Sequence, residues 1–174
     1  LLGIRFVNGA GEVLRSGGRV LKNVTGLDLC KLLAGSHGTL GVLTEVTLKV
    51  LPAPEASASI GVRVSDVATG VAALSAGLGS PYGVSGAALI PAFCGPDGPA
   101  NHVAFLRLED FSDSVRYRSA RLAEDLARFG EVRVLEDAES RDLWGAIRDA
   151  GPLGVAPEEA VWRVSGRPSA GPGV

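Results

Sequence analysis

The stretch GSHGTLGV, residues 35–42, combines the residue types that a chain uses to hold a ligand with its backbone. Glycine has no Cβ, so main-chain N–H groups in this stretch can come close to a flat or anionic molecule. Ser36 and Thr39 add hydroxyl groups to the same surface. The pattern is compatible with a loop that holds a diphosphate or the edge of a ring, and equally with a helix end followed by a tight turn. The glycines concerned are Gly35, Gly38 and Gly41.

Residues that could act as acids, bases, nucleophiles or metal ligands are sparse. His37 and His102 are the only histidines, and neither has a second His, Cys or carboxylate pair at a metal-binding spacing. The chain contains no GxSxG, no GxxxxGK[ST] and no GxGxxG followed by a helix. The sequence therefore predicts no metal site and identifies no catalytic residue, and we expect His102 to be a surface residue.

Two other pairs of residues have both a functional and a structural interpretation. Lys22 and Asn23 lie in a glycine-rich loop, where they can donate hydrogen bonds to a ligand, although a solvated loop is the commoner explanation. Trp144 and Arg148 lie in a predicted helix. We expect the ring to be a core residue rather than a stacking platform, and the arginine to be a surface residue rather than a clamp for a substrate.

The composition limits the class of protein. The 174 residues are 46% hydrophobic, which is enough for one packed domain or two small ones. A net charge of -2 without blocks of like charge gives no reason to expect a nucleic-acid partner, and no apolar run is long enough for insertion into a membrane. Cys30 and Cys94 are predicted to be buried thiols in a reducing compartment, with a disulfide less favoured. The absence of any methionine suggests a piece of a longer protein that lacks both ends.

Local patterns in the first 50 residues predict a β-hairpin, a short helix and a strand. LLGIRFVN and EVLR, residues 1–8 and 12–15, flank a turn that contains two glycines. Asp28 is positioned to cap a helix that Gly35 ends. Strict alternation then predicts a half-buried strand with one apolar face, formed by Val42, Thr44, Val46, Leu48 and Val50.

Pro52 and Pro54 cannot continue a sheet ladder, so a boundary between two structural units is expected there. Beyond it the pattern alternates between strands and helices. The helix that follows Asp66 has an apolar stripe formed by Val67, Val71, Leu74 and Leu78. Strands are predicted at 56–64, 84–90, 102–110, 131–136 and 160–166, and helices at 66–78, at 112–129 with Ser112 as its cap, and at 138–150.

From residue 56 onwards this order is strand, helix, strand, strand, helix, strand, followed by an added helix and strand. It is the order of the split βαβ, ferredoxin-like plait, which packs its helices on one face of an antiparallel sheet. The predicted fold class is therefore α+β, and one face of the sheet is left available to cover another group.

Residues 16–55, SGGRVLKNVTGLDLCKLLAGSHGTLGVLTEVTLKVLPAPE, resemble the second half of the FAD-binding domain of the vanillyl-alcohol-oxidase, or PCMH-type, flavoproteins. Within that family the likeness is to the glycolate oxidase subunits, in particular the FAD-binding E subunit. The resemblance implies that residues 1–54 are the C-terminal part of an FAD-binding PCMH-type domain. It also implies that residues 55–174 are an incomplete ferredoxin-like substrate or cap domain.

The same resemblance assigns FAD contacts to consecutive positions of the glycine stretch, and it favours the ligand interpretation over the purely structural one. Two residues are weaker additions, Ser36 and Asn23. The segments LWGAIRD and VWRVSG, residues 143–149 and 161–166, resemble a helix and a strand of the E subunit's cap. The implied FAD contacts are Gly38, Thr39, Leu40, Gly41 and Val42.

The implied function is oxidation of a small 2-hydroxy acid such as glycolate, with the flavin accepting a hydride and passing electrons to a partner. A second flavin subunit and an iron–sulfur subunit are the implied partners. The implied location is the cytoplasm, with any attachment to the inner membrane made through these partners. Two alternatives stay open: a related FAD-linked oxidase such as D-lactate dehydrogenase or an alkyl-dihydroxyacetone-phosphate synthase relative, and a non-catalytic plait-type binding module. RNA binding is disfavoured, because aromatic residues make up only 5% of the chain.

Two positions depart from the family pattern. Leu27 stands where the family commonly has tyrosine, and His37 stands where it often has an acidic or apolar residue. The histidine lies inside the implied flavin-contact stretch, so it is not assigned as the general base. The family's other FAD subdomain would precede residue 1, and we therefore expect this chain by itself to bind FAD weakly or not at all.

Overall fold

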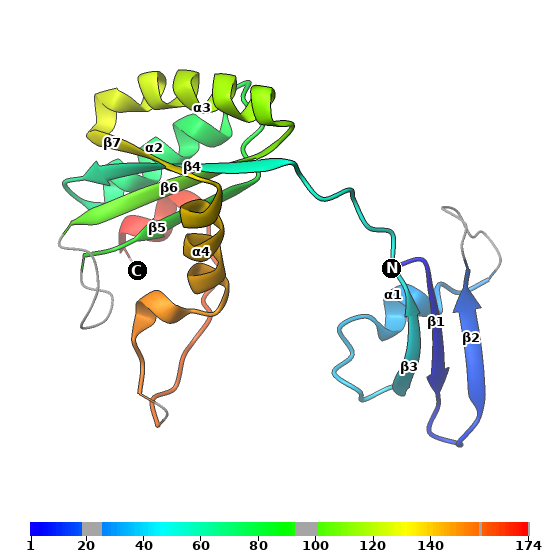
Figure 1. Cartoon of the computed structure of the whole chain (residues 1–174). Coiled ribbons are helices and arrows are strands. Elements are labelled where there is room, and N and C mark those ends of the chain that lie inside the picture. Colours follow the sequence, from blue (N-terminus) through cyan, green and yellow to red (C-terminus); the bar gives the residue numbers. More distant parts are fainter. Residues whose placement is uncertain (19–25, 93–100, 157, 174) are drawn as a thin grey trace. The chain divides into compact units, whose positions relative to one another are not determined.

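The computed structural model describes residues 1–18, 26–92, 101–156 and 158–173. The chain forms two compact units, Leu1–Ala53 and Pro54–Val174, which are described separately below. Figure 1 shows the elements of each unit. The predicted site residue Asn23 and the second cysteine, Cys94, lie outside the described residues.

The first unit contains a three-stranded antiparallel sheet with the order β2-β1-β3. The predicted hairpin is confirmed, and its turn is held by Asn8, whose Oδ1 accepts hydrogen bonds from the backbone N–H groups of Ala10 and Glu12, both at 3.0 Å. The strands are β1 (Gly3–Val7), β2 (Val13–Gly17) and β3 (Val42–Thr47).

A short helix, α1 (Leu29–Leu33), packs against this sheet and begins at the predicted cap. The Oδ1 of Asp28 accepts a hydrogen bond from the backbone N–H of Lys31 at 3.2 Å. Gly35 follows the helix with φ of 81°, a left-handed value that suits glycine. The small core of the unit consists of Ile4, Phe6, Cys30 and Leu33, so the predicted burial of Cys30 as a free thiol is confirmed.

The prediction of one continuous apolar face for residues 42–50 is wrong. Strand β3 ends at Thr47, and the register between β1 and β3 shifts between Arg5 and Phe6. Val42 pairs with Val7, whereas Val46 pairs with Ile4; because paired residues share a face, the two valines lie on opposite faces. Both are exposed, by 65% and 51%, so the strand is not half-buried either.

The second unit has the predicted split βαβ order and a four-stranded antiparallel sheet with the strand order β5-β6-β4-β7. The ferredoxin-like plait is therefore confirmed. Its strands are β4 (Ala56–Val64), β5 (Gly86–Ile90), β6 (His102–Asp110) and β7 (Glu131–Glu136). Its helices are α2 (Val67–Leu78), α3 (Ser112–Leu126) and α4 (Asp137–Arg148), and short 3-10 turns are η1 (Ala127–Phe129), η2 (Gly151–Leu153) and η3 (Pro168–Gly173).

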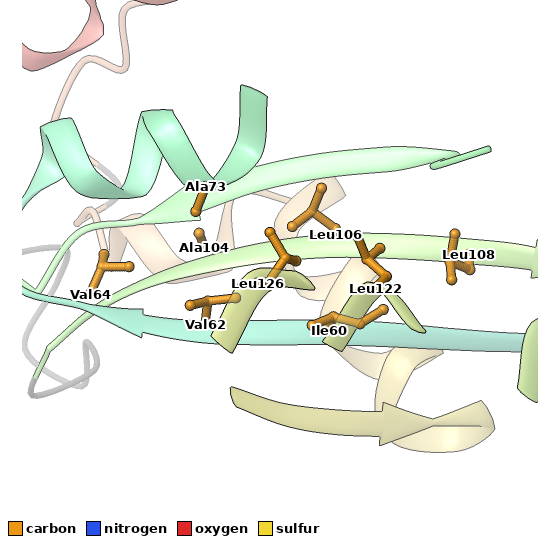
Figure 2. Close-up of a cluster of buried hydrophobic side chains, with 9 residues drawn as sticks. All are labelled: Ile60, Val62, Val64, Ala73, Ala104, Leu106, Leu108, Leu122 and Leu126. Carbon is orange, nitrogen blue, oxygen red and sulfur yellow. The ribbon is translucent and has the colours of Figure 1, made fainter. Parts of the chain in front are cut away.

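Helices α2 and α3 cover one face of this sheet, as Figure 1 shows, and the main core lies between them and the strands. Figure 2 shows this core around the even-numbered positions of β4 and β6. Helix α2 uses the predicted stripe only in part: Leu74 packs against the core, Val67 and Val71 are half-buried, and Leu78 is exposed. The fully buried positions of the helix are Gly70, Ala73 and Gly77. A Cβ on Gly77 would lie 2.2 Å from Leu106 Cδ2, so the missing side chain allows the helix to approach the sheet closely.

Helix α4 lies on the opposite face of the sheet (Figure 1). Polar contacts join it to the sheet: the Ser140 hydroxyl is 3.0 Å from that of Ser57 and 2.8 Å from that of Ser59, and the indole N–H of Trp144 donates to Ser59 Oγ at 2.8 Å. Because odd-numbered residues of β4 face this side, the alternation along the strand separates the apolar core from this hydroxyl cluster.

Two further local predictions are wrong. Residues 160–166 form no strand; they are irregular, and Trp162 is 85% exposed, because the segment does not pair with an edge of the sheet. Ser112 is the first residue of α3 rather than its cap. Its backbone N–H donates to the carboxylate of Glu55 at 3.2 Å, so a side chain distant in sequence satisfies this helix end.

Candidate functional site

The glycine stretch forms a tight turn between α1 and β3. The carbonyl oxygen of Ser36 accepts hydrogen bonds from both the backbone N–H and the hydroxyl of Thr39, at 3.0 and 2.7 Å. His37 and Gly38 have φ values of 52° and 78°, the pair of positive angles that characterises a type I′ turn. These hydrogen bonds and turn angles constrain the backbone of residues 36–39 locally.

The three glycines of the stretch have different reasons to be glycine. Gly35 ends the helix, and Gly41 passes so close to β1 that a Cβ would lie 2.8 Å from the carbonyl oxygen of Val7. Gly38 has a φ of 78° in the turn, where glycine is favoured, and a Cβ there, as at Gly35, would meet nothing within 4 Å. Helix termination, strand packing and the turn conformation thus explain the three glycines, and the flank of the turn at Gly38 is open.

Of the seven residues predicted to contact the cofactor, five lie on this loop and a sixth, Val42, is the first residue of β3. Ser36 and Gly41 are half-buried, whereas Gly38, Thr39, Leu40 and Val42 are exposed. Leu40 is 49% exposed and Val42 is 65% exposed, so apolar surface flanks the open glycine. Their contact with a flavin stays a prediction.

The described segment around this loop, residues 26–44, contains few charged or titratable side chains. His37 is exposed, and Leu27, at the position where the resembled family commonly has tyrosine, is exposed as well. The side chain of Lys31, 3.2 Å from the Asp28 carboxylate, and its backbone N–H hold the pKa of that carboxyl below its usual value. The exposed pair keeps the helix start charged, and it supplies no group suited to proton transfer.

The structure of the second unit decides between the two interpretations of Trp144 and Arg148. Trp144 is half-buried and donates its indole N–H to Ser59, and the Arg107 guanidinium carbon lies 4.9 Å from the centroid of its ring. Arg148 is exposed, and two hydrogen bonds of 2.7 and 2.9 Å join it to Asp149. Trp144 is thus a packing residue whose ring also contacts the Arg107 guanidinium. Sequence reasoning missed Arg107, although the alternation along residues 102–110 places it on the face of the sheet that α4 partly covers.

The remaining histidine and the search for metal ligands give little chemistry. His102, predicted to be a surface residue, is half-buried, and its Nδ1 accepts a hydrogen bond from the backbone N–H of Ala92 at 3.3 Å. No group of three His, Cys, Asp or Glu side chains in the described part of the chain is arranged to hold a metal ion. Among the described helices, none combines the length and apolar character that a membrane span requires.

Sequence comparison finds relatives among flavin-linked oxidoreductases, although no protein-family model matches the chain. Over 65 residues, or 37% of this chain, it is 55% identical to glycolate oxidase subunit GlcE of Escherichia coli, of which the match covers 19%. It is 44% identical over 55 residues, 32% of the chain, to glycolate oxidase subunit GlcD of Bacillus subtilis, covering 12% of that protein. A D-lactate dehydrogenase of Anaerostipes hadrus is 48% identical over 50 residues, 29% of this chain and 10% of the relative. The chain therefore spans a small part of the length of these relatives.

Structural comparison covers more of the chain. Alkyldihydroxyacetonephosphate synthase matches 87% of the chain with a TM-score of 0.60 and 18% identity, over 32% of that protein. Substrate-bound p-cresol methylhydroxylase matches 78% with a TM-score of 0.55 and 16% identity, over 34% of its chain. These likenesses concern the fold alone. Together, the sequence and structural matches show that this chain is a relative of the FAD-linked oxidoreductases that include the glycolate oxidase subunits, with the fold of the PCMH-type flavoproteins.

Proposed function

We propose that this chain supplies one wall of an FAD site in an oxidoreductase that acts on a small 2-hydroxy acid such as glycolate. The observation that carries the proposal is the open flank of the turn at Gly38. The chain that contains this turn is 55% identical over 65 residues to a glycolate oxidase subunit. Residues 1–54 are the proposed part of the FAD-binding domain, and residues 55–174 are the proposed substrate or cap domain.

The loop fits a flat cofactor in three respects. Its conformation is fixed by the Ser36–Thr39 turn, so little backbone entropy is lost when a ligand binds. Gly38 leaves its outer flank free of side-chain atoms. Leu40 and Val42 provide exposed apolar surface that a ring system would cover. Asn23 and Ser36 are retained as weaker proposed contacts.

When bound, FAD supplies the acceptor for the hydride removed from the α-carbon of the acid. The chain's own part is to hold and orient the cofactor. The Thr39 hydroxyl already donates its hydrogen to Ser36, so toward a ligand it can act only as an acceptor. The sparse titratable groups around the loop favour a role in cofactor binding and electron transfer, with a second flavin subunit and an iron–sulfur subunit as proposed partners.

D-lactate is the second candidate substrate, because a D-lactate dehydrogenase is among the relatives at 48% identity over 50 residues. Steady-state oxidation of glycolate and of D-lactate by the full-length protein, with an artificial dye as electron acceptor, separates the two. Loss of both activities in the presence of all partner subunits would contradict the proposed reaction.

The cofactor site itself is tested by a matched pair of substitutions. Gly38 and Gly11 have nearly the same φ, 78° and 79°, and a Cβ on either would meet nothing within 4 Å. Alanine therefore introduces the same backbone strain at both positions. In the full-length protein that carries this sequence, we expect Gly38→Ala to weaken FAD binding about tenfold and Gly11→Ala to leave it unchanged.

The readouts are the flavin content of the purified protein and the quenching of FAD fluorescence on titration. Equal losses from both substitutions would attribute the effect to strain and contradict a contact at Gly38. A wild-type full-length protein that binds no flavin would overturn the proposed function as a whole.

A further inference from the structure

A cleft of about 420 Å³ lies in the second unit between α4 and the sheet, and basic side chains line much of it. Three arginines, Arg107, Arg141 and Arg148, and one acid, Glu109, line it together with Trp144. Each arginine has an acidic neighbour: Glu109 lies 3.1 Å from Arg107, Asp137 lies 3.5 Å from Arg141, and Asp149 lies 2.7 Å from Arg148. The cleft therefore offers guanidinium donors rather than an excess of positive charge.

Arg107 is held in a fixed orientation inside this cleft. Its Nε donates to Ser85 Oγ at 3.2 Å and lies 3.1 Å from Glu109 Oε2, and its guanidinium carbon lies 4.9 Å from the centroid of the Trp144 ring. The side chain is 28% exposed, so it is partly removed from water. Its orientation therefore costs little further side-chain entropy when an anion binds.

The two terminal nitrogens of Arg107 have no hydrogen-bond partner among the residues that the structure describes. These nitrogens form the fork that matches a carboxylate in bidentate geometry. The other two arginines differ in this respect. Arg148 makes two bonds to Asp149, and Arg141 lies 3.5 Å from Asp137, so their charges are already paired on α4.

We propose that this cleft binds a small carboxylate and that Arg107 is its anchor, with Trp144 and Glu109 as positioning residues. Arg141 and Arg148 also line the cleft, each beside its acidic partner on or next to α4. The choice of a carboxylate as the ligand rests on the proposed function, whereas the cleft and the positions of its charged side chains are independent of it. The site lies wholly within the second unit, so it can be tested without any flavin.

The test follows Trp144 while glycolate is titrated into the 174-residue chain. Trp162→Phe removes the only other tryptophan, which is 85% exposed, and leaves Trp144 as the sole emitter at 295 nm excitation. Saturable change in its fluorescence is expected with glycolate and not with glycolamide, which has the same shape but no charge. In the same background, we expect Arg107→Gln to weaken glycolate binding at least about tenfold and Arg107→Lys to restore part of it.

Two other arginines serve as controls. Arg63 is on the same face of the sheet outside this cleft and is paired with Glu131 at 3.0 Å, so Arg63→Gln should leave binding unchanged. Arg148→Gln should reduce affinity a few-fold at most, because the charge of Arg148 is already balanced by Asp149. The assignment is overturned if glycolamide binds as well as glycolate, or if Arg148→Gln weakens binding more than Arg107→Gln does. It is also overturned if a wild-type chain, shown to be folded by circular dichroism, does not bind glycolate saturably. If glycolate binds but the full-length protein contains no flavin, the site stands and the proposed function falls.

Discussion

The indole N–H of Trp144 donates a hydrogen bond of 2.8 Å to the hydroxyl of Ser59, and this bond joins α4 to the central strand of the plait. Ser59 also contacts Ser140 at 2.8 Å, and Ser140 contacts Ser57 at 3.0 Å. Buried hydroxyls are costly unless they are paired, and here each one has a partner. These directional bonds therefore help to hold the helix on this face, where the side chains of Leu143, Trp144 and Ile147 are also half-buried.

Replacement of this indole should loosen the helix. Trp144→Phe removes the donor to Ser59 and weakens the stacking of Arg107, so we expect the free energy of unfolding of the second unit to fall by about 1–2 kcal/mol. Urea denaturation followed by circular dichroism measures this loss. Trp162→Phe is the matched control, because that ring is 85% exposed and should give no change. An equal effect from both substitutions would contradict the stabilising role of the bond.

Glycines on two helices of the plait should respond to alanine in opposite directions. At Gly77 a Cβ would lie 2.2 Å from Leu106 Cδ2, so Gly77→Ala should destabilise the unit by about 1–3 kcal/mol. At Gly145 on α4 a Cβ would meet nothing within 4 Å, and Gly145→Ala should stabilise it by about 0.5–1 kcal/mol. Thermal unfolding of both variants gives the two signs. A stable Gly77→Ala variant would show that α2 is not packed this closely on the sheet.

Acid stability should depend on Asp66, the cap of α2. Hydrogen bonds from the Ser65 hydroxyl and from the backbone N–H and hydroxyl of Thr69 lower the pKa of its carboxyl to about 2. A folded-state pKa below the unfolded value contributes stability that is complete above about pH 4 and is lost as the pH falls toward 2. Asp66→Asn keeps an acceptor for the cap but does not titrate, so it should flatten this part of the stability curve.

Urea midpoints of the wild type and Asp66→Asn, measured from neutral pH down to about pH 2, test this. The difference between the two proteins should change only within the window named. A constant difference across the whole range would mean that the carboxyl has an ordinary pKa.

Gly41 should matter for the first unit independently of any ligand. Gly41→Ala would place a Cβ 2.8 Å from the Val7 carbonyl oxygen and 3.2 Å from the Phe6 ring, and we expect a loss of about 1–3 kcal/mol. Gly9→Ala is the control, since a Cβ there meets nothing within 4 Å. Hydrogen exchange of the β1 and β3 amides reports on this unit alone. Unchanged exchange in Gly41→Ala would show that this approach of the strands is not tight.

Features that depend on neighbouring residues in the sequence could be predicted well. Asp28 caps α1, and Gly35 follows that helix, as their residue types and spacing indicate. Alternation and turn residues located β1, β2 and the four strands of the plait, and their order was enough for the ferredoxin-like topology. The glycine stretch was identified as the candidate site, and six of the predicted residues lie on its loop and at the first position of β3.

Features that depend on partners distant in sequence could not be predicted. The cap of α3 comes from Glu55 and not from Ser112, because a carboxylate far along the chain reaches the helix end. Residues 160–166 have a β-type composition but pair with no edge strand. The alternation that predicts a single apolar face for residues 42–50 is interrupted by a shift in register between β1 and β3.

The sequence by itself determined much of the local backbone: the caps of α1 and α2, the hairpin turn and the strand and helix order of the plait, since each depends on torsional preferences and on bonds between near neighbours. Which glycines are needed for close packing, and which have open space beside them, was decided only by the tertiary structure. It also brought Arg107 onto the ring of Trp144 from elements distant in sequence. Such contacts depend on how close two elements approach, and that distance is set by the packing of the whole unit.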